Sequence, residues 1–172
     1  MGVREIVLLG DPVLRRKAEE VEAFDDDLRA LVDDLFTSMA AAEGAGLAAP
    51  QIGVSKRVLV VDVRHVTGEH ARVALVNPRV VDESPEEDKD AEGCLSIPGV
   101  SEVVRRPARV TIEGFDPAGE PLRVDADGLY SRALQHEIDH LDGILFVDHL
   151  SPLKRRLLLQ KYRKLREEEG AE

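Results

Sequence analysis

The stretch QHEIDHLDG (135–143) restricts the local fold more than any other part of the sequence. Its two histidines, His136 and His140, are four residues apart, a spacing that puts two side chains on the same face of an α-helix. Asp127 can serve as the N-cap of that helix and Gly143 as its C′ residue, so the sequence predicts a helix between them. Two imidazoles on one helical face, with Cβ atoms about 5–6 Å apart, can converge on one metal ion.

Glu137 adds a third feature to the same helix. Its offset of about 100° from His136 keeps the carboxylate out of direct ligation but within reach of a metal-bound water. An isolated H-E-x-x-H match also fits a polar surface helix that contains two histidines by chance. Three of the five histidines lie at positions 136, 140 and 149, and this concentration, together with the helix caps, favours a metal site.

The third protein ligand has to come from elsewhere in the chain. Gly143 matches the glycine of the longer pattern H-E-x-x-H-x-x-G-x-x-H, but the last position is Phe146, which cannot bind a metal. Glutamates are available at 167–169, in a charged terminal segment that is expected to be solvated. Cys94, the single cysteine, is the better candidate, although an isolated cysteine is more often a small buried apolar residue. One sulfur and two nitrogens would leave a fourth position for water.

Two helices are predicted besides the histidine helix. The first has an apolar stripe that follows three aspartates and ends near Glu43, and the stripe consists of Leu28, Leu31, Val32, Leu35 and Met39. The last helix begins at Ser151-Pro152. Its expected apolar face consists of Leu153, Leu157, Leu158, Tyr162 and Leu165.

The middle of the chain is rich in strand patterns, so the fold class is predicted to be α+β. Four segments are expected to form two pairs of strands, 57–63 with 71–78 and 108–116 with 121–126. Residues 82–93 are expected to form an acidic loop. We therefore predict antiparallel or mixed β-sheets packed around a central metal-binding helix, with N- and C-terminal helices. Residues 1–172 would form a single catalytic domain, with the C-terminal helix at 152–169.

Composition excludes several classes of protein. The chain has 172 residues, enough for one domain, and no Trp, so its core is expected to be aliphatic. No apolar run approaches the roughly 18 residues of a membrane span. A single cysteine cannot form an intrachain disulfide, which favours a cytoplasmic location. The net charge of −11 argues against direct nucleic-acid binding.

The stretch GAGLAA (44–49) matches the dinucleotide-binding pattern G-x-G-x-x-A. That pattern requires a strand before it and a helix after it, whereas here a helix precedes it and Pro50 follows it. We therefore reject a dinucleotide site. The glycines would instead let an extended backbone approach a ligand closely, such as a peptide substrate. Gln51 offers an amide donor just beyond them, although an ordinary surface glutamine would fit the sequence equally well.

Three stretches taken together resemble a known family. GAGLAAPQ (44–51), EGCLS (92–96) and QHEIDHLDG (135–143) are similar, in order and spacing, to the three signature motifs of peptide deformylases. GDPVLRRKAEEV (10–21) also resembles the opening segment of that family. The resemblance covers nearly the whole chain, and no chemically required position departs from it. It implies that the protein hydrolyses the N-formyl group from the initiator methionine of newly made polypeptides and releases formate.

The resemblance also implies a role for each matched residue. Cys94, His136 and His140 would bind the metal, and Glu137 would act as general base and then as general acid while a metal-bound hydroxide attacks the formyl carbon. The amide of Gln51 and the backbone N–H of Leu95 would stabilise the oxyanion. Substrate-binding positions would be Ala45, Gly46, Glu92 and Gly93.

Leu129 and Ala133 are candidates for the methionine pocket. They lie seven and three residues before His136, hence on the metal-facing side of the helix. For Leu129, the same periodicity also fits ordinary packing in the hydrophobic core.

The sequence allows two alternatives for the metal ion and two for the role of the C-terminal basic segment. Ligation by one cysteine and two histidines suits zinc, whereas the resemblance implies ferrous iron in the cell, with zinc, nickel or cobalt possible in the purified protein. In similar deformylases the region of KRRLLLQKYRKLR (154–166) docks on the ribosome. A basic segment of this kind also fits a solvated surface that complements the C-terminal end of the helix.

Two other classes of protein share part of this pattern. A zinc endopeptidase would cleave internal peptide bonds and would have no need of Cys94. A structural zinc site usually has four protein ligands, and it would leave the position of Glu137 unexplained. Release of formate from a formylated peptide separates a deformylase from both alternatives.

Overall fold

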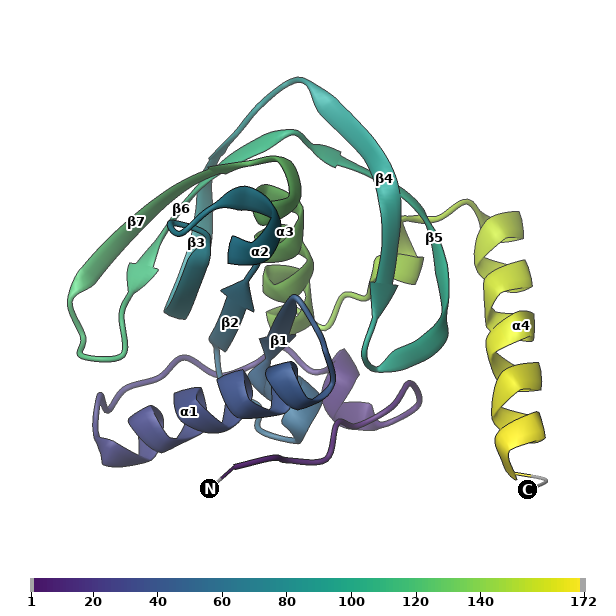
Figure 1. Ribbon diagram of the computed structural model, residues 1–172, viewed down its shortest axis with the longest axis horizontal. Coiled ribbons are helices and arrows are strands. Elements are labelled where there is room, and N and C mark those ends of the chain that lie inside the picture. The colour runs from purple at the N-terminus through teal and green to yellow at the C-terminus, as the bar shows by residue number, and fades with distance from the viewer. Residues whose placement is uncertain (1, 171–172) are drawn as a thin grey trace.

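The computed structural model describes residues 2–170, and it contains a five-stranded sheet, a two-stranded sheet and helices packed around them (Figure 1). The strands are β1 (Gly46–Ala48), β2 (Val58–Asp62), β3 (Arg72–Glu83), β4 (Glu87–Cys94), β5 (Ile97–Pro107), β6 (Arg109–Phe115) and β7 (Pro121–Asp127). The larger sheet has the order β1-β2-β3-β6-β7, and β4 pairs with β5 in the smaller sheet. All of these pairings are antiparallel. The predicted α+β class is confirmed, and so are both predicted pairs of strands, β2 with β3 and β6 with β7.

The helical segments are η1 (Pro12–Arg15), α1 (Asp26–Ala41), η2 (Ala49–Ile52), α2 (Arg64–Thr67), α3 (Gly128–Leu141), η3 (Phe146–His149) and α4 (Pro152–Gly170). The first predicted helix is α1. It begins after Asp25, whose carboxylate accepts a hydrogen bond of 3.1 Å from the Leu28 N–H. Its apolar stripe, including Val32 and Leu35, packs against Val58 in β2 and forms one hydrophobic core of the protein.

The second core lies between α3 and the five-stranded sheet. Leu134, Ile138 and Leu141 of α3 pack in one cluster with Leu59 of β2 and Ile112 of β6. In Figure 1, α3 occupies the centre of the molecule, with β3, β6 and β7 of the larger sheet on one side and β4 and β5 on the other. The predicted central helix is therefore present, and its apolar face fixes which way its polar face points.

The two ends of α3 differ in how well the sequence predicted them. Asp127 occupies the N-cap position, but its side chain makes no capping hydrogen bond, so the predicted cap is wrong in that respect. Gly143 is the C′ residue, as predicted, with a left-handed φ of 74°. The Ile144 N–H bonds to the Asp139 carbonyl at 2.9 Å and completes this helix end. A Cβ at Gly143 would lie only 2.6 Å from the carbonyl oxygen of Arg15, so the position admits no side chain.

Residues 82–93 do not form the predicted acidic loop. β3 continues to Glu83, and β4 begins at Glu87 and pairs with β5, which the sequence analysis did not predict as a strand. Most acidic side chains of β4 face solvent, while the backbone is hydrogen-bonded to β5. The prediction failed because charge and turn residues are local signals, whereas strand formation here depends on partner residues in β5 that lie 10 to 20 positions further along the chain.

The C-terminal helix α4 begins at Pro152, as predicted, but only part of its predicted apolar face is covered. Leu158 and Tyr162 are buried against β5 and η3, and Leu165 is partly buried there. Leu153 and Leu157 are 56% and 53% exposed, although Leu158, next to Leu157 in the same turn, is buried, so these two leucines lie outside the covered face of α4. No helix among residues 2–170 is long and apolar enough to cross a membrane.

Candidate metal centre

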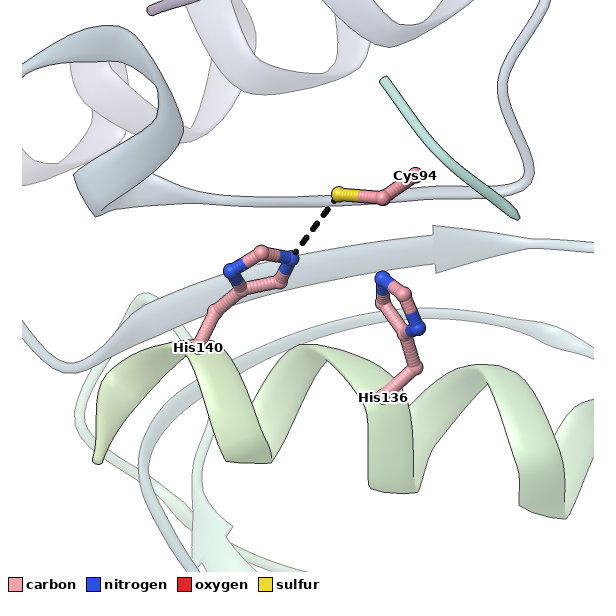
Figure 2. Close-up of side chains that lie close together, drawn as sticks. All are labelled: Cys94, His136 and His140. Atoms are coloured by element: carbon pink, nitrogen blue, oxygen red, sulfur yellow. Dashed lines mark hydrogen bonds between the residues drawn. The ribbon is translucent and has the colours of Figure 1, made fainter. Parts of the chain in front are cut away.

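Three potential metal ligands converge where β4 meets α3 (Figure 2). Cys94 is the last residue of β4, and His136 and His140 come from consecutive turns of α3. Their ligand atoms, one sulfur and two nitrogens, all lie within 4.8 Å of one another, and the Cys94 Sγ is 3.4 Å from the His140 Nε2. In the part of the chain that the structure describes, no other group of three such side chains could hold a metal ion in this way.

This donor set fits a divalent transition metal. Thiolate and imidazole are common ligands of such ions, and three protein ligands leave room for water or substrate. Burial lowers the pKa of His140 well below its ordinary value, and the nearby charge of His136 acts in the same direction, so the His140 ring is neutral, as a metal ligand must be. Oε1 of Glu137 is buried and has no hydrogen-bond partner among residues 2–170, which leaves it available to a water or a substrate.

His136 is oriented from its far side. Its Nδ1 lies 3.0 Å from Oε1 of Glu92, which leaves Nε2 for a metal ion. Burial acts to lower the pKa of His136, but the carboxylate of Glu137 and contacts with Cys94 and Glu92 raise it well above its ordinary value. A metal ion would therefore have to displace a proton from this ring. Phe146, which replaces the third histidine of the longer zinc motif, stacks on the His136 ring with 6.2 Å between centroids.

Glu92 lies in a buried network of charges that the sequence analysis did not predict. Its carboxylate accepts hydrogen bonds from the guanidinium groups of Arg106 at 2.5 Å and Arg132 at 2.6 Å. Burial acts to raise the pKa of Glu92, but hydrogen bonds with His136 and Arg106 hold it well below its ordinary value. Arginine is normally exposed, so its burial is hard to predict from sequence. The one available signal was the position of Arg132, four residues before His136 on the same helical face.

A cavity of about 450 Å³ opens beside the three ligands. Its lining includes every predicted site residue except His140, namely Ala45, Gly46, Gln51, Glu92, Gly93, Cys94, Leu95, Leu129, Ala133, His136 and Glu137. His140 is 1% exposed and does not line the cavity. Leu129 is 37% exposed and belongs to the cavity lining, not to the hydrophobic core. Ala133 contributes to both the cavity wall and the core beneath the larger sheet.

The glycines of β1 and of the turn before it leave space for the side chains of two other site residues. A Cβ at Gly46 would lie 2.7 Å from Oε2 of Glu137, and a Cβ at Gly44 would lie 2.7 Å from Cδ1 of Leu95. The sequence predicted a close approach by a ligand at these positions, and the structure brings protein side chains close to them. Burial raises the pKa of Glu137 to about 7, a value at which a carboxyl group can both accept and donate a proton near neutral pH.

Gln51 lies in η2, directly after β1, and is held by hydrogen bonds at both ends of its amide. Oε1 accepts a bond of 3.0 Å from the Ala48 N–H, and Nε2 donates to the Ser96 Oγ at 3.1 Å. Nε2 also lies 3.6 Å from the Cys94 Sγ. Gln51 is 1% exposed, so it is not the ordinary surface residue that the sequence also allowed.

Comparisons with known proteins agree on one family. The model of the family described as polypeptide deformylase matches residues 3–156. The peptide deformylase of Natranaerobius thermophilus is 51% identical over 86% of this chain and 92% of its own length. The structure of a Legionella pneumophila peptide deformylase is 43% identical with a TM-score of 0.91 and covers 99% of both chains. The Ehrlichia chaffeensis peptide deformylase, solved in complex with actinonin, is 42% identical with a TM-score of 0.88, and the match covers 95% of this chain and 98% of that one.

Proposed function

This chain belongs to the peptide deformylase family, metal-dependent enzymes that remove the N-formyl group from nascent polypeptides, and we propose that Cys94, His136 and His140 hold its metal ion. The observation that carries this assignment is the convergence of the three ligand atoms within 4.8 Å, beside a buried carboxyl group. When bound, the ion would lower the pKa of a water towards about 7 and act as a Lewis acid on the formyl carbonyl. Ferrous iron is the ion we propose in the cell, and zinc, nickel or cobalt also suit these donors.

Glu137 would move the protons of the reaction. Its Oε1 has no partner among residues 2–170, and its pKa of about 7 suits a group that must act in both directions. It would accept a proton from the attacking water as the new C–O bond forms at the formyl carbon. It would then deliver that proton to the nitrogen as the C–N bond breaks, so that the products are formate and a free amine.

The remaining predicted residues would hold the substrate. The Gln51 amide and the Leu95 N–H would donate to the developing oxyanion, while the backbones of Ala45, Gly46 and Gly93 would hold the peptide. The side chains of Leu129 and Ala133 would contact the methionine. Glu92 also lines this cavity, but its carboxylate already has three buried partners, so we propose that it acts chiefly by orienting His136.

The direct test is formate release from formyl-Met-Ala-Ser by the purified, metal-loaded protein. Glu137→Ala is expected to lower kcat by about 10²–10⁴-fold with the metal retained, since general acid–base catalysis typically contributes that much. Asp82→Ala, an exposed carboxylate on β3, is the matched control and should leave kcat unchanged. Cleavage of blocked internal peptides would instead identify an endopeptidase, and a four-coordinate metal with no turnover would identify a structural site.

We propose further that the chain works in the cytoplasm as a single catalytic domain on nascent polypeptides. For α4, the exposure of Leu153 and Leu157 within a basic segment favours a docking surface for the ribosome over a purely solvated one. Changing both leucines to serine should weaken co-sedimentation with ribosomes while formate release from a free peptide stays the same. Unchanged co-sedimentation would leave the segment as a solvated surface.

A further inference from the structure

Ser96 is a buried polar residue directly beside the site but outside its cavity. It follows Cys94 and Leu95 in the turn between β4 and β5, and it is 0% exposed. Its carbonyl oxygen accepts a hydrogen bond of 2.9 Å from the Leu9 N–H, and its hydroxyl oxygen accepts one of 3.1 Å from Nε2 of Gln51. A substrate in the cavity cannot touch Ser96, so any effect of its side chain on the reaction has to pass through a neighbour.

The orientation of the Gln51 amide follows from its two partners. The oxygen and the nitrogen of a glutamine amide exchange places when the group turns by 180°, and only one arrangement puts donors towards the site. The Ala48 N–H can only donate, so the amide atom 3.0 Å from it has to be the oxygen. The NH₂ group therefore points the other way, towards Ser96 and Cys94.

The two hydrogens of that NH₂ group have different partners. One is directed at the Ser96 Oγ at 3.1 Å, and Nε2 also lies 3.6 Å from the Cys94 Sγ, on the side of the proposed metal ligands. We propose that Ser96 is a positioning residue for Gln51: its hydroxyl accepts one amide hydrogen and so holds the second on the metal side, where a formyl oxygen would bind. This inference rests on the role proposed above for Gln51 as an oxyanion donor.

Removing the Ser96 hydroxyl should change the direction of the Gln51 N–H groups without removing the Gln51 amide from the site. In Ser96→Ala, one buried N–H of Gln51 loses its partner, and the amide gains by rotating to find another. Loss of a whole oxyanion donor costs about 10²–10³-fold in kcat, so a donor that is present but poorly aimed should cost less, about tenfold. KM for formyl-Met-Ala-Ser and the bound metal per chain should both stay the same, because Ser96 does not line the cavity and is not one of the proposed metal ligands.

A matched pair of variants separates the hydroxyl group from packing. Ser96→Thr keeps the hydroxyl and adds a methyl group, whereas Ser96→Val has the same shape as threonine without the hydroxyl. Any strain from the added methyl group is common to both, so kcat of Ser96→Thr should exceed that of Ser96→Val by about tenfold, as in the comparison of wild type with alanine. Equal kcat values for the threonine and valine variants would overturn the proposal, even if the alanine variant failed to fold.

A double-mutant cycle shows whether Ser96 acts through Gln51. The four proteins are the wild type, Ser96→Ala, Gln51→Met and the double variant, each checked for metal content and thermal unfolding. The proposal expects Ser96→Ala to lower kcat in the wild type and to have no further effect on Gln51→Met. An equal loss in both backgrounds would assign Ser96 a purely structural effect and overturn the proposal. A fully active Gln51→Met would instead contradict the proposed role of Gln51 itself, so the two failures are distinguishable.

Discussion

The cavity beside α3 and a larger cleft beside β3, β6 and β7 differ in the burial of their charged side chains, and this difference separates a reactive site from an ordinary surface cleft. The cleft has a volume of about 620 Å³ against about 450 Å³ for the cavity. We call it the acidic cleft, because its lining includes Asp82, Glu83, Asp125 and Asp127. All four of these side chains are exposed to solvent.

The smaller cavity has fewer carboxylates but places them differently. Glu92 and Glu137 are 7% and 4% exposed, and both lie beside His136. Burial away from water disfavours the charged form of a carboxyl group, and this raises the pKa of Glu137 to about 7 even though the charge of His136 acts to lower it. Carboxylates in the acidic cleft are surrounded by water that screens them. Burial of converging polar groups, and not the volume of the hollow, therefore identifies the candidate site.

The largest contrast is expected from removing a metal ligand. Cys94→Ala leaves two imidazoles without the thiolate, so the protein should lose its bound metal and its formate release should fall to background. Asp125→Ala in the acidic cleft should retain both. Metal per chain by atomic spectroscopy and formate release from formyl-Met-Ala-Ser measure the contrast. A Cys94→Ala protein with a full complement of metal and normal kcat would show that the cavity does not differ from the acidic cleft in metal binding or catalysis.

Glu92→Ala tests the network behind His136. Arg132 would lose its buried carboxylate partner and Arg106 would keep only Asp139, which should lower the free energy of unfolding by about 3–5 kcal/mol. Metal affinity should fall by about 10–100-fold, because His136 would lose the partner that orients it. Urea denaturation and competition with a chelator measure the two effects. Asp82→Ala, the exposed control, should change the free energy of unfolding by no more than about 0.5 kcal/mol.

Gly46→Ala should have a smaller effect on the same site. The added Cβ would lie 2.7 Å from Oε2 of Glu137, so the carboxyl group has to shift. Such a displacement should lower kcat by roughly tenfold while the metal stays bound. Gly170→Ala in α4, where nothing lies within 4 Å of the added atom, is the matched control. If kcat of Gly46→Ala equals that of the control, the close packing of β1 against Glu137 has no role in placing the carboxyl group.

The smallest effect is expected at Asp34, a buried carboxylate that lines neither the cavity nor the acidic cleft. Asp34 accepts a hydrogen bond of 2.7 Å from the Gly2 N–H and one from Arg4, and these contacts hold its pKa below the ordinary 3.8. A lowered pKa in the folded protein stabilises the fold fully at pH values above the ordinary pKa of 3.8, and this contribution is lost as the pH falls from 3.8 through the lower pKa of the folded state.

Asp34→Ala should therefore lower the unfolding temperature by a few degrees at pH 7, with a difference from wild type that shrinks below pH 3.8. Thermal unfolding followed from pH 3 to pH 7 measures this trend, and kcat should not change. A difference in unfolding temperature that is the same at every pH would show that Asp34 acts through packing alone.

Local patterns predicted the elements that carry their own signals. α1 has apolar residues at helical spacing, α3 has two histidines at helical spacing and a glycine just past its end, and the two predicted strand pairs have alternating or β-branched runs around a polar turn. β4 has neither signal, since most of its side chains are charged and exposed. It is a strand because β5 supplies hydrogen bonds to its backbone, and a local pattern cannot reveal such a partner.

The candidate site divides in a similar way. Cys94, His136 and His140 could be selected from the sequence because few residue types bind metals and only one cysteine is present. The buried arginines around Glu92, and the serine that orients Gln51, have no such chemical signature. Their roles depend on neighbours that are distant in the sequence. Similarly, Leu153 and Leu157 have the right spacing for a buried face, yet more than half of each residue is exposed.

The sequence by itself determined the residue types available for metal chemistry and the helix that puts two imidazoles on one face, because helical geometry relates spacing directly to direction. Only the tertiary structure decided how close the Cys94 sulfur lies to the two imidazoles, which partners Glu92 has, and that Glu137 is buried. These depend on how β4 and β1 pack against α3, and packing is set by contacts between segments that are far apart in the chain. The chemistry expected of the site depends on that burial, since a carboxyl group exposed to water keeps its ordinary pKa.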